Sequence, residues 1–221
     1  MDPRSGALSV GLCDYKSFIA TNLCTDASLV AALEAEGSER GDNARLLFAD
    51  AFGNAALLVT GDGMAVLQLR ASTAEFNAFF DFPGGHAEPD KMPSDRAGAA
   101  AVARELFQAV LDEVVEELHC SAHALEAPLL LGVIRAKANR GKPTAVFYVQ
   151  GTFTSRELAA CYASGTHGES SALAFVTRDG VVASVVPRTD AVREGDGVQA
   201  MRLTPSAEFG LASWRKRDEH V

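Results

Sequence analysis

Two segments most limit what this chain can fold into and do: a glycine-rich loop over residues 82–89 and an acidic stretch over residues 112–117. The loop reads Phe-Pro-Gly-Gly-His-Ala-Glu-Pro, and a glycine pair after proline allows a sharp turn or the close approach of another group. In the second segment Glu113, Glu116 and Glu117 are spaced i, i+3 and i+4, so they project from one face of a helix. Apolar residues occupy the opposite face, which indicates a helix docked on a core.

Carboxylates gathered on one helical face repel one another, at a cost of roughly a few tenths of a kcal/mol for each close pair. A hard divalent cation such as Mg2+ prefers oxygen ligands and is often shared with substrate phosphates, so it would offset this repulsion. The alternative is a solvated acidic face without a ligand, which is the usual meaning of an acidic run on a helix. Both interpretations stay open at this point.

The composition is that of a globular enzyme. Of 221 residues, 48% are hydrophobic and 22% charged, which suits one domain with a full core. The formal net charge of -9 disfavours a nucleic-acid partner. We also expect no membrane partner and a cytoplasmic location, because no secretory signal and no membrane-spanning apolar run is visible. Widely scattered cysteines predict buried free thiols in a reducing compartment: Cys13, Cys24, Cys120 and Cys161.

The predicted elements are mostly strands, interrupted by a central and a late helix. Helices are expected over residues 14–36 in two pieces, with Asp26 as an N-cap, and over 97–119, 155–162 and 206–215. Strands are expected over 46–48, 55–59, 64–69, 129–136, 144–153 and 172–176. Residues 61–63 predict a hairpin turn, and residues 37–43 a polar connection. This order favours an α/β or α+β fold with a mixed sheet packed by helices.

The loop and the acidic helix together resemble the Nudix hydrolase superfamily, whose signature is G-x5-E-x7-R-E-U-x-E-E-x-G-U, with U an apolar residue. The signature glutamates fall on the three helix glutamates described above. Asp112 stands where the signature has Arg, and His119 where it has its last Gly. Gly85 precedes Glu113 by 28 positions, further than in the signature. Lys91 stands six positions after Gly85, where the signature has Glu.

A competing register aligns Arg104 and Glu105 with the R-E pair of the signature. Gln108 and Ala109 would then replace the two later glutamates, so this register loses the metal ligands and we reject it. The extended box of the first register resembles the uridine diphosphate glucose pyrophosphatase branch of the superfamily. Other segments share this resemblance: residues 12–18, 21–22, 81–89, 128–132, 147–150 and 205–207.

The resemblance implies an α/β/α sandwich around a mixed β-sheet. It implies one domain over residues 1–221, with an N-terminal helical extension over 1–43 and a Nudix core over 44–221. The implied reaction is Mg2+-dependent hydrolysis of a nucleotide sugar, with Mn2+ as a substitute cation; UDP-glucose would give UMP and a sugar 1-phosphate. Glu113 and Glu117 would hold the metal, and Glu116 would be a third ligand or would orient the attacking water. The implied substrate contacts are Tyr15, Arg70, Ala74, Asp81, His86, Glu88 and Ser206.

Two other functions stay open. The chain could hydrolyse another nucleoside diphosphate derivative, such as ADP-ribose, or it could be a catalytically silent protein that binds a nucleotide. The altered box favours the silent protein, whereas retention of three helix glutamates argues against it. Several candidate residues also have purely structural alternatives: an amphipathic core side chain for Tyr15, a surface position for Arg70, a turn cap for Asp81 and an N-cap for Ser206.

Overall fold

The computed structural model describes residues 11–41, 43–91, 98–165, 168–187 and 201–217. The chain divides into two compact units. One unit comprises Met1–Phe52 with Arg135–Pro143, and the other comprises Gly53–Ile134 with Thr144–Val221. The predicted division into an extension over residues 1–43 and a core over residues 44–221 stays a prediction.

The first unit contains the helices α1 (Tyr15–Thr21) and α2 (Ala27–Gly41). Asp26 accepts hydrogen bonds from the N–H groups of Ser28 and Leu29 at 2.9 and 3.2 Å, so the predicted N-cap is confirmed. The helix then continues to Gly41, and the polar connection predicted over residues 37–43 is wrong for its helical part.

The strand predicted over residues 46–48 is also wrong, because these residues lie in consecutive turns. The N–H of Leu46 donates to the carbonyl of Asn43 at 2.9 Å, and the N–H of Phe48 donates to Arg45 at 3.0 Å. Local bonds of this kind satisfy the backbone without a partner strand. The short apolar run was therefore mistaken for a strand. A one-turn 3-10 helix, η3 (Lys137–Asn139), completes the unit.

The second unit is built on a mixed sheet. Its strands, within the described residues, are β1 (Gly53–Val59), β2 (Ala65–Arg70), β3 (Phe80–Asp81), β4 (Leu129–Ala136), β5 (Lys142–Gln150), β6 (Ser170–Val176) and β7 (Val182–Pro187). The strand order is β4-β5-β1-β2-β6-β7, with β3 paired to β2. Strands β1 and β5 are parallel, whereas β2 pairs antiparallel with β1, β3 and β6, and β6 with β7. The predicted mixed sheet is confirmed.

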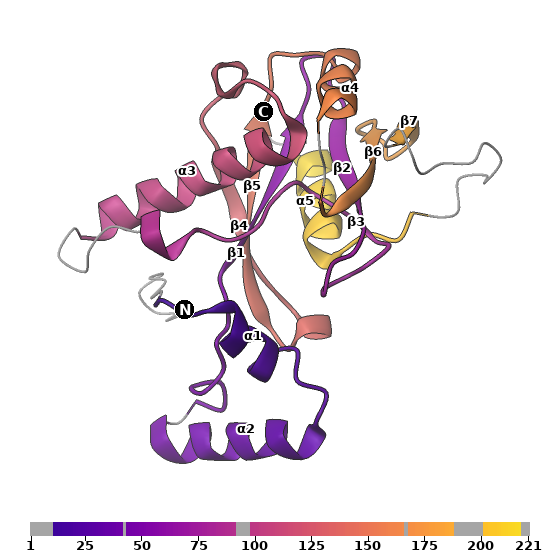
Figure 1. Cartoon of the computed structure of the whole chain (residues 1–221). Helices are drawn as coiled ribbons and strands as arrows, with labels where there is room; N and C mark the ends of the chain where they lie inside the picture. Colours follow the sequence, from indigo (N-terminus) through magenta and orange to yellow (C-terminus); the bar gives the residue numbers. More distant parts are fainter. Residues whose placement is uncertain (1–10, 42, 92–97, 166–167, 188–200, 218–221) are drawn as a thin grey trace. The chain divides into compact units, whose positions relative to one another are not determined.

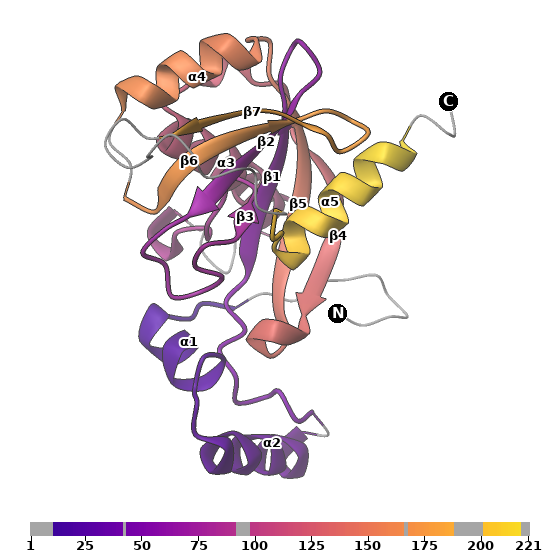
Figure 2. The same ribbon diagram turned by 90° about the vertical axis from the view of Figure 1, so that its right-hand side faces the viewer.

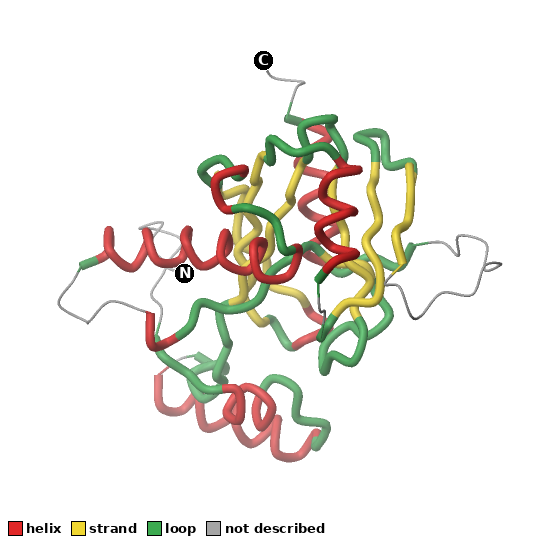
Figure 3. Tube along the Cα trace, turned by 45° about the horizontal axis from the view of Figure 1, so that its top comes forward, coloured by secondary structure: helices red, strands yellow, loops and turns green. Residues whose placement is uncertain are grey.

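Helices cover both faces of this sheet (Figures 1–3). Helices α3 (Ala99–Leu118) and α4 (Ser155–Ser164) lie on one face, and α5 (Pro205–Lys216) lies on the other. All residues of β1 are buried, as expected for a strand covered on two sides. Alternate β1 residues (Ala55, Leu57, Val59) form a core cluster with side chains of α5. The fold is the α/β/α sandwich that the resemblance implied.

Helix α3 carries the acidic face and ends at His119. Its buried residues, Ala109, Val110, Val114 and Leu118, form one stripe that packs on the sheet. His119 has a φ of 53°, in the left-handed region. Glycine is favoured at this position after a helix, which explains in physical terms why the signature has Gly there.

None of the described helices combines the length and apolar character needed to cross a membrane. The four cysteines are free thiols, as predicted; Cys120 is buried, whereas Cys13, Cys24 and Cys161 are partly exposed, so their predicted burial is wrong. The sequence predicts no helix or strand within residues 178–204. Part of this segment forms β7, at the edge of the sheet, and residues 188–200 lie outside the described residues.

Candidate active site

The glycine-rich loop is fixed to the first half of β1. The N–H of Asn54 donates to the carbonyl of Gly85 at 2.9 Å, and the N–H of Ala56 donates to Pro83 at 2.8 Å. The Asn54 side chain returns the contact, because its Oδ1 accepts from the N–H of Gly85 at 2.9 Å. Residues 83–85 are therefore held as an added, irregular partner of β1.

The same loop is hydrogen-bonded to the acidic face of α3. The N–H of Gly84 donates to Oε2 of Glu117 at 2.9 Å, and the N–H of His86 donates to Oε1 of Glu113 at 3.1 Å. The Gln68 side chain also reaches Oε2 of Glu117, at 3.3 Å. Two of the three predicted helix glutamates are thus oriented by main-chain donors of the predicted loop.

Both glycines are required by close approach. A Cβ on Gly84 would lie 2.8 Å from the Cα of Ala55 and would collide with the carbonyl oxygen of Asn54. A Cβ on Gly85 would collide with the Glu113 carboxylate, with its Cδ at 2.6 Å. Any side chain here would separate the loop from the strand or from the helix. The close approach that the Gly-Gly pair indicated in the sequence is therefore present.

The loop and helix line a pocket of about 410 Å³. Its lining combines the three helix glutamates with the loop and with the start of β6: Gly84, Gly85, His86, Glu113, Glu116, Glu117, Gly168, Glu169 and Ser170. Glu116 and Glu169 are exposed, whereas Glu113 and Glu117 are partly buried. We call this feature the acidic pocket, because four carboxylates line it.

The electrostatics of the acidic pocket oppose ionisation of its own carboxylates. Burial raises the pKa of Glu117 to about 8; the N–H of Gly84 lowers it, while the charges of Glu113 and Glu169 raise it further. Burial likewise raises the pKa of Glu113, against the effect of the His86 N–H. A positive charge placed among these groups would therefore be strongly stabilised.

The donor set of the acidic pocket fits a hard divalent cation. The main-chain bonds use one oxygen of each carboxylate, Oε2 of Glu117 and Oε1 of Glu113, so a second oxygen on each side chain is available as a ligand. In the described part of the chain, no three acidic, histidine or cysteine side chains already converge on one point. The carboxylates line the wall of the acidic pocket.

A second cluster forms where β3 meets α5, and we call it the Asp81 cluster. Oδ1 of Asp81 accepts from the hydroxyls of Thr204 and Ser206 at 2.6 and 2.8 Å and from the N–H of Phe82 at 2.9 Å. Nη1 of Arg70 lies 3.7 Å from Oδ2. The predicted substrate residues Arg70, Asp81 and Ser206 are therefore brought together, but none of them lines the acidic pocket in the described structure.

Three further predicted contacts are exposed: Tyr15, Ala74 and Glu88. Tyr15 belongs to the first unit, where it is exposed and its ring centroid lies 6.2 Å from that of Phe18. Ala74 is exposed in a bend after β2. Glu88 is exposed and forms an ion pair with Lys91 at 3.3 Å. Their roles as substrate contacts stay predictions.

The sequence analysis did not identify three residues that contact the glycine-rich loop, contact Glu117 or line the acidic pocket. Asn54 and Gln68 are buried in β1 and β2, and the available signal was a polar residue inside an otherwise apolar strand, which needs a hydrogen-bond partner. Glu169 precedes β6, and only the pairing of β6 with β2 brings it to the acidic pocket. No local pattern in the sequence marks it.

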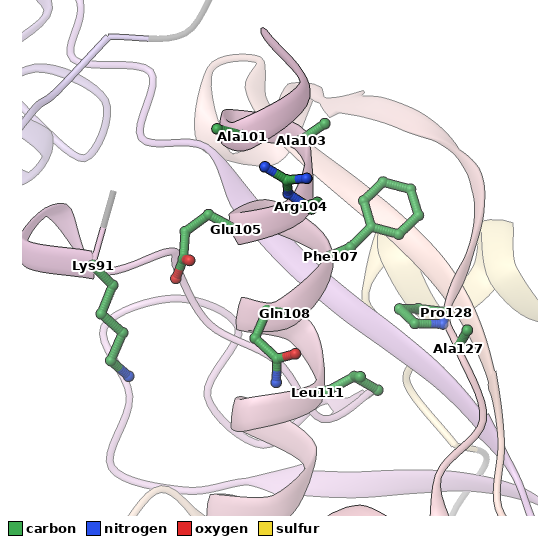
Figure 4. Close-up of a pocket in the computed structure, with 10 residues that line it drawn as sticks. All are labelled: Lys91, Ala101, Ala103, Arg104, Glu105, Phe107, Gln108, Leu111, Ala127 and Pro128. Atoms are coloured by element: carbon green, nitrogen blue, oxygen red, sulfur yellow. The ribbon is translucent and has the colours of Figure 1, made fainter. Parts of the chain in front are cut away.

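The first half of α3 borders a different and larger groove, of about 780 Å³ (Figure 4). Arg104 and Glu105, the pair of the rejected register, line this groove with apolar side chains that include Phe107 and Leu111. The acidic pocket instead involves the second half of the helix. The two registers of the signature thus correspond to two separate surfaces of one helix.

Several known proteins are similar to this chain in sequence. The chain is 37% identical over 180 residues to "Uridine diphosphate glucose pyrophosphatase NUDT22" of Mus musculus, covering 76% of this chain and 57% of the relative. The protein of the same name from Homo sapiens is 35% identical over 185 residues, covering 79% and 59%. "Nudix hydrolase 9" of Arabidopsis thaliana is 30% identical over 185 residues, covering 78% and 58%. This chain belongs to the Nudix hydrolase superfamily.

The relatives are longer than this chain. The Nudix chain described here spans less than two thirds of the length of these curated relatives. No family model matches the chain. Among solved structures, a Nudix hydrolase from M. Smegmatis, RenU, aligns with a TM-score of 0.43 and 15% identity over 78% of this chain and 88% of that chain, which adds nothing to the assignment.

Proposed function

We propose that this chain is a divalent-metal-dependent Nudix pyrophosphatase that hydrolyses UDP-glucose to UMP and glucose 1-phosphate. The observation that carries the proposal is the junction at which the N–H groups of Gly84 and His86 hold the carboxylates of Glu117 and Glu113 in one pocket. The similarity to proteins named uridine diphosphate glucose pyrophosphatase supports the substrate class.

Glu113 and Glu117 are the proposed ligands of Mg2+, with Mn2+ as a substitute. When bound, the cation would offset the negative charge of the pyrophosphate oxygens. Glu116 lines the same pocket and is exposed, so its carboxylate is free to meet solvent. We assign it the task of orienting the attacking water in line with the bond to be cleaved.

His86 and Arg70 are the proposed contacts of the substrate phosphates. His86 lines the acidic pocket, beside the place where phosphate groups would lie. Nη1 of Arg70 lies 3.7 Å from Oδ2 of Asp81, and the charge of Arg70 also acts on Glu117; we propose that it offsets phosphate charge as well. The free thiols support a reducing, cytoplasmic location.

A substrate panel tests this proposal. The purified chain is incubated with Mg2+ and UDP-glucose, other UDP-sugars or ADP-ribose, and the released monophosphate is measured. We expect selective release of UMP, lost on chelation and in Glu117→Gln but retained in the control Glu126→Gln, which changes an exposed glutamate outside the acidic pocket.

Other outcomes select the alternatives. Release of AMP from ADP-ribose with little UMP release would favour hydrolysis of another nucleoside diphosphate derivative. Turnover of no member of the panel would reject the enzyme and favour a silent nucleotide-binding protein.

A further inference from the structure

The loop meets α3 at a second place, through an ion pair. Lys91 ends the one-turn helix η1 (Pro89–Lys91); its Nζ lies 3.8 Å from Oδ2 of Asp112 and 3.3 Å from Oε2 of Glu88. Asp112 is oriented from its own helix, because Nε2 of Gln108 donates to Oδ1 at 2.8 Å. Figure 4 shows Lys91 on the loop side of the groove and Gln108 on the helix.

The two partners are also the two charge departures from the signature. Counted from Gly85, Lys91 stands where the signature has Glu; counted from Glu113, Asp112 stands where it has Arg. Either departure alone would leave two like charges at these positions, whereas both together retain one positive and one negative charge. We propose that they are a single compensated change, an ion pair of reversed polarity that positions the loop against α3 for the proposed function.

The place of the pair in the chain connects it to the acidic pocket. Asp112 directly precedes Glu113, whose carboxylate accepts the N–H of His86 at 3.1 Å. Lys91 follows His86 by five residues, so the ion pair ties the far end of the same loop to the same turn of the helix. A shift of the loop would move the donor that orients Glu113.

The surroundings of Lys91 make its charge important. Glu88, Asp112 and Glu105 all face it; the hydrogen bond with Glu88 is the main cause of its raised pKa, and the charges of the other two carboxylates add to it. A carboxylate at this position would meet these three like charges. Both partners are about half exposed, with side-chain exposures of 49% and 41%. Such pairs add little to overall stability, so the expected effect is on the geometry of the junction.

A charge swap tests the proposal: Lys91→Glu, Asp112→Arg and the double variant. The first measurement is the Mg2+ concentration for half-maximal UMP release, and the second is the rise in melting temperature caused by Mg2+ or Mn2+ without substrate. Each single variant should raise the cation requirement about three- to tenfold, and the double variant should return within about twofold of the wild type. Lys91→Arg, which keeps the charge, should behave as the wild type.

Matched controls make the same charge changes elsewhere. Lys216→Glu and Glu126→Arg alter exposed residues outside both pockets and should leave the cation requirement unchanged, alone or together. A double swap whose defect equals the product of the two single defects would overturn the proposal.

The two measurements separate this inference from the function on which it rests. If no nucleotide sugar is hydrolysed but the cation-induced melting shift follows the swap pattern, the proposed reaction fails and the ion pair stands. If UMP is released but the swap pattern is absent from both measurements, the ion pair fails and the reaction stands. A wild type without any response to either cation overturns both.

Discussion

The acidic pocket and the Asp81 cluster bury carboxylates at opposite ends of residues 81–86 and satisfy them in opposite ways. Asp81 accepts three hydrogen bonds from neutral donors and faces the guanidinium of Arg70. Glu117 accepts one N–H at 2.9 Å and a longer amide contact at 3.3 Å, beside carboxylates of like charge. Burial raises the pKa of both groups.

We infer from this difference that Asp81 has a structural role, whereas Glu117, as proposed above, holds a ligand. Around Asp81 the charge is already balanced inside the molecule, and the cluster joins β3 to the first turn of α5. Around Glu117 the charges of Glu113 and Glu169 raise its pKa and the charge of Arg70 lowers it, and a cation from outside would complete the proposed site. Burial raises the pKa of both Asp81 and Glu117, but their neighbouring groups differ, so we infer different roles for the two carboxylates.

The largest expected effect is that of Glu117→Gln on activity. The change removes a proposed metal ligand but keeps the size of the side chain and its ability to accept the N–H of Gly84. UMP release should fall about 10³-fold, while the metal-free protein melts no lower than the wild type. Steady-state kinetics and thermal unfolding in chelator measure the two quantities. An equal loss of activity in Asp81→Asn would break the comparison.

Substitutions of the two loop glycines should affect stability and activity to different extents. In Gly84→Ala the new Cβ meets the main chain of β1, which has no room to move, so the free energy of unfolding should fall by about 2–4 kcal/mol. In Gly85→Ala the Cβ meets the end of the Glu113 side chain, which can rotate away. Stability should then fall by less than in Gly84→Ala, and activity by about tenfold. Denaturant titrations and UMP release check both.

Asp81→Asn should mainly change stability. The amide keeps an acceptor for the hydroxyls of Thr204 and Ser206 but loses the charge that balances Arg70. We expect the free energy of unfolding to fall by about 1–2 kcal/mol and the turnover number to stay within about threefold. If the KM for UDP-glucose instead rises strongly at an unchanged melting temperature, Asp81 is a substrate contact, as the resemblance implied.

The sequence was informative where structure is local and less so where it depends on distant partners. The turn at residues 61–63 forms because Gly63 adopts a φ of +80° between paired strands. The acidic face of α3 follows from spacing alone. By contrast, the apolar residues 46–48 satisfy their backbone in turns. Asn54 and Glu169 acquire their roles only when β1, β2 and β6 assemble, and no local pattern specifies that pairing.

The smallest expected effect is the pH dependence of the metal-free protein. Glu117 has a pKa of about 8 in the folded state, against an ordinary value of 4.5, so the folded state binds this proton more tightly than the unfolded state. Its stabilising contribution is complete below about pH 4.5 and is lost as the pH rises through about 8. Because the side chain is partly exposed, we expect a loss of only about 1–2 kcal/mol between pH 5 and 8.

The Glu117→Gln variant isolates this contribution, since all other titrating groups are shared with the wild type. Denaturant midpoints in chelator, measured from pH 5 to 8, should show the wild type losing stability relative to the variant. Added Mg2+ should restore the wild type at pH 8, where the carboxylate is ionised, and should leave the variant unchanged. A constant difference between the two proteins would mean that Glu117 is balanced as fully as Asp81, and the contrast between the two regions would then disappear.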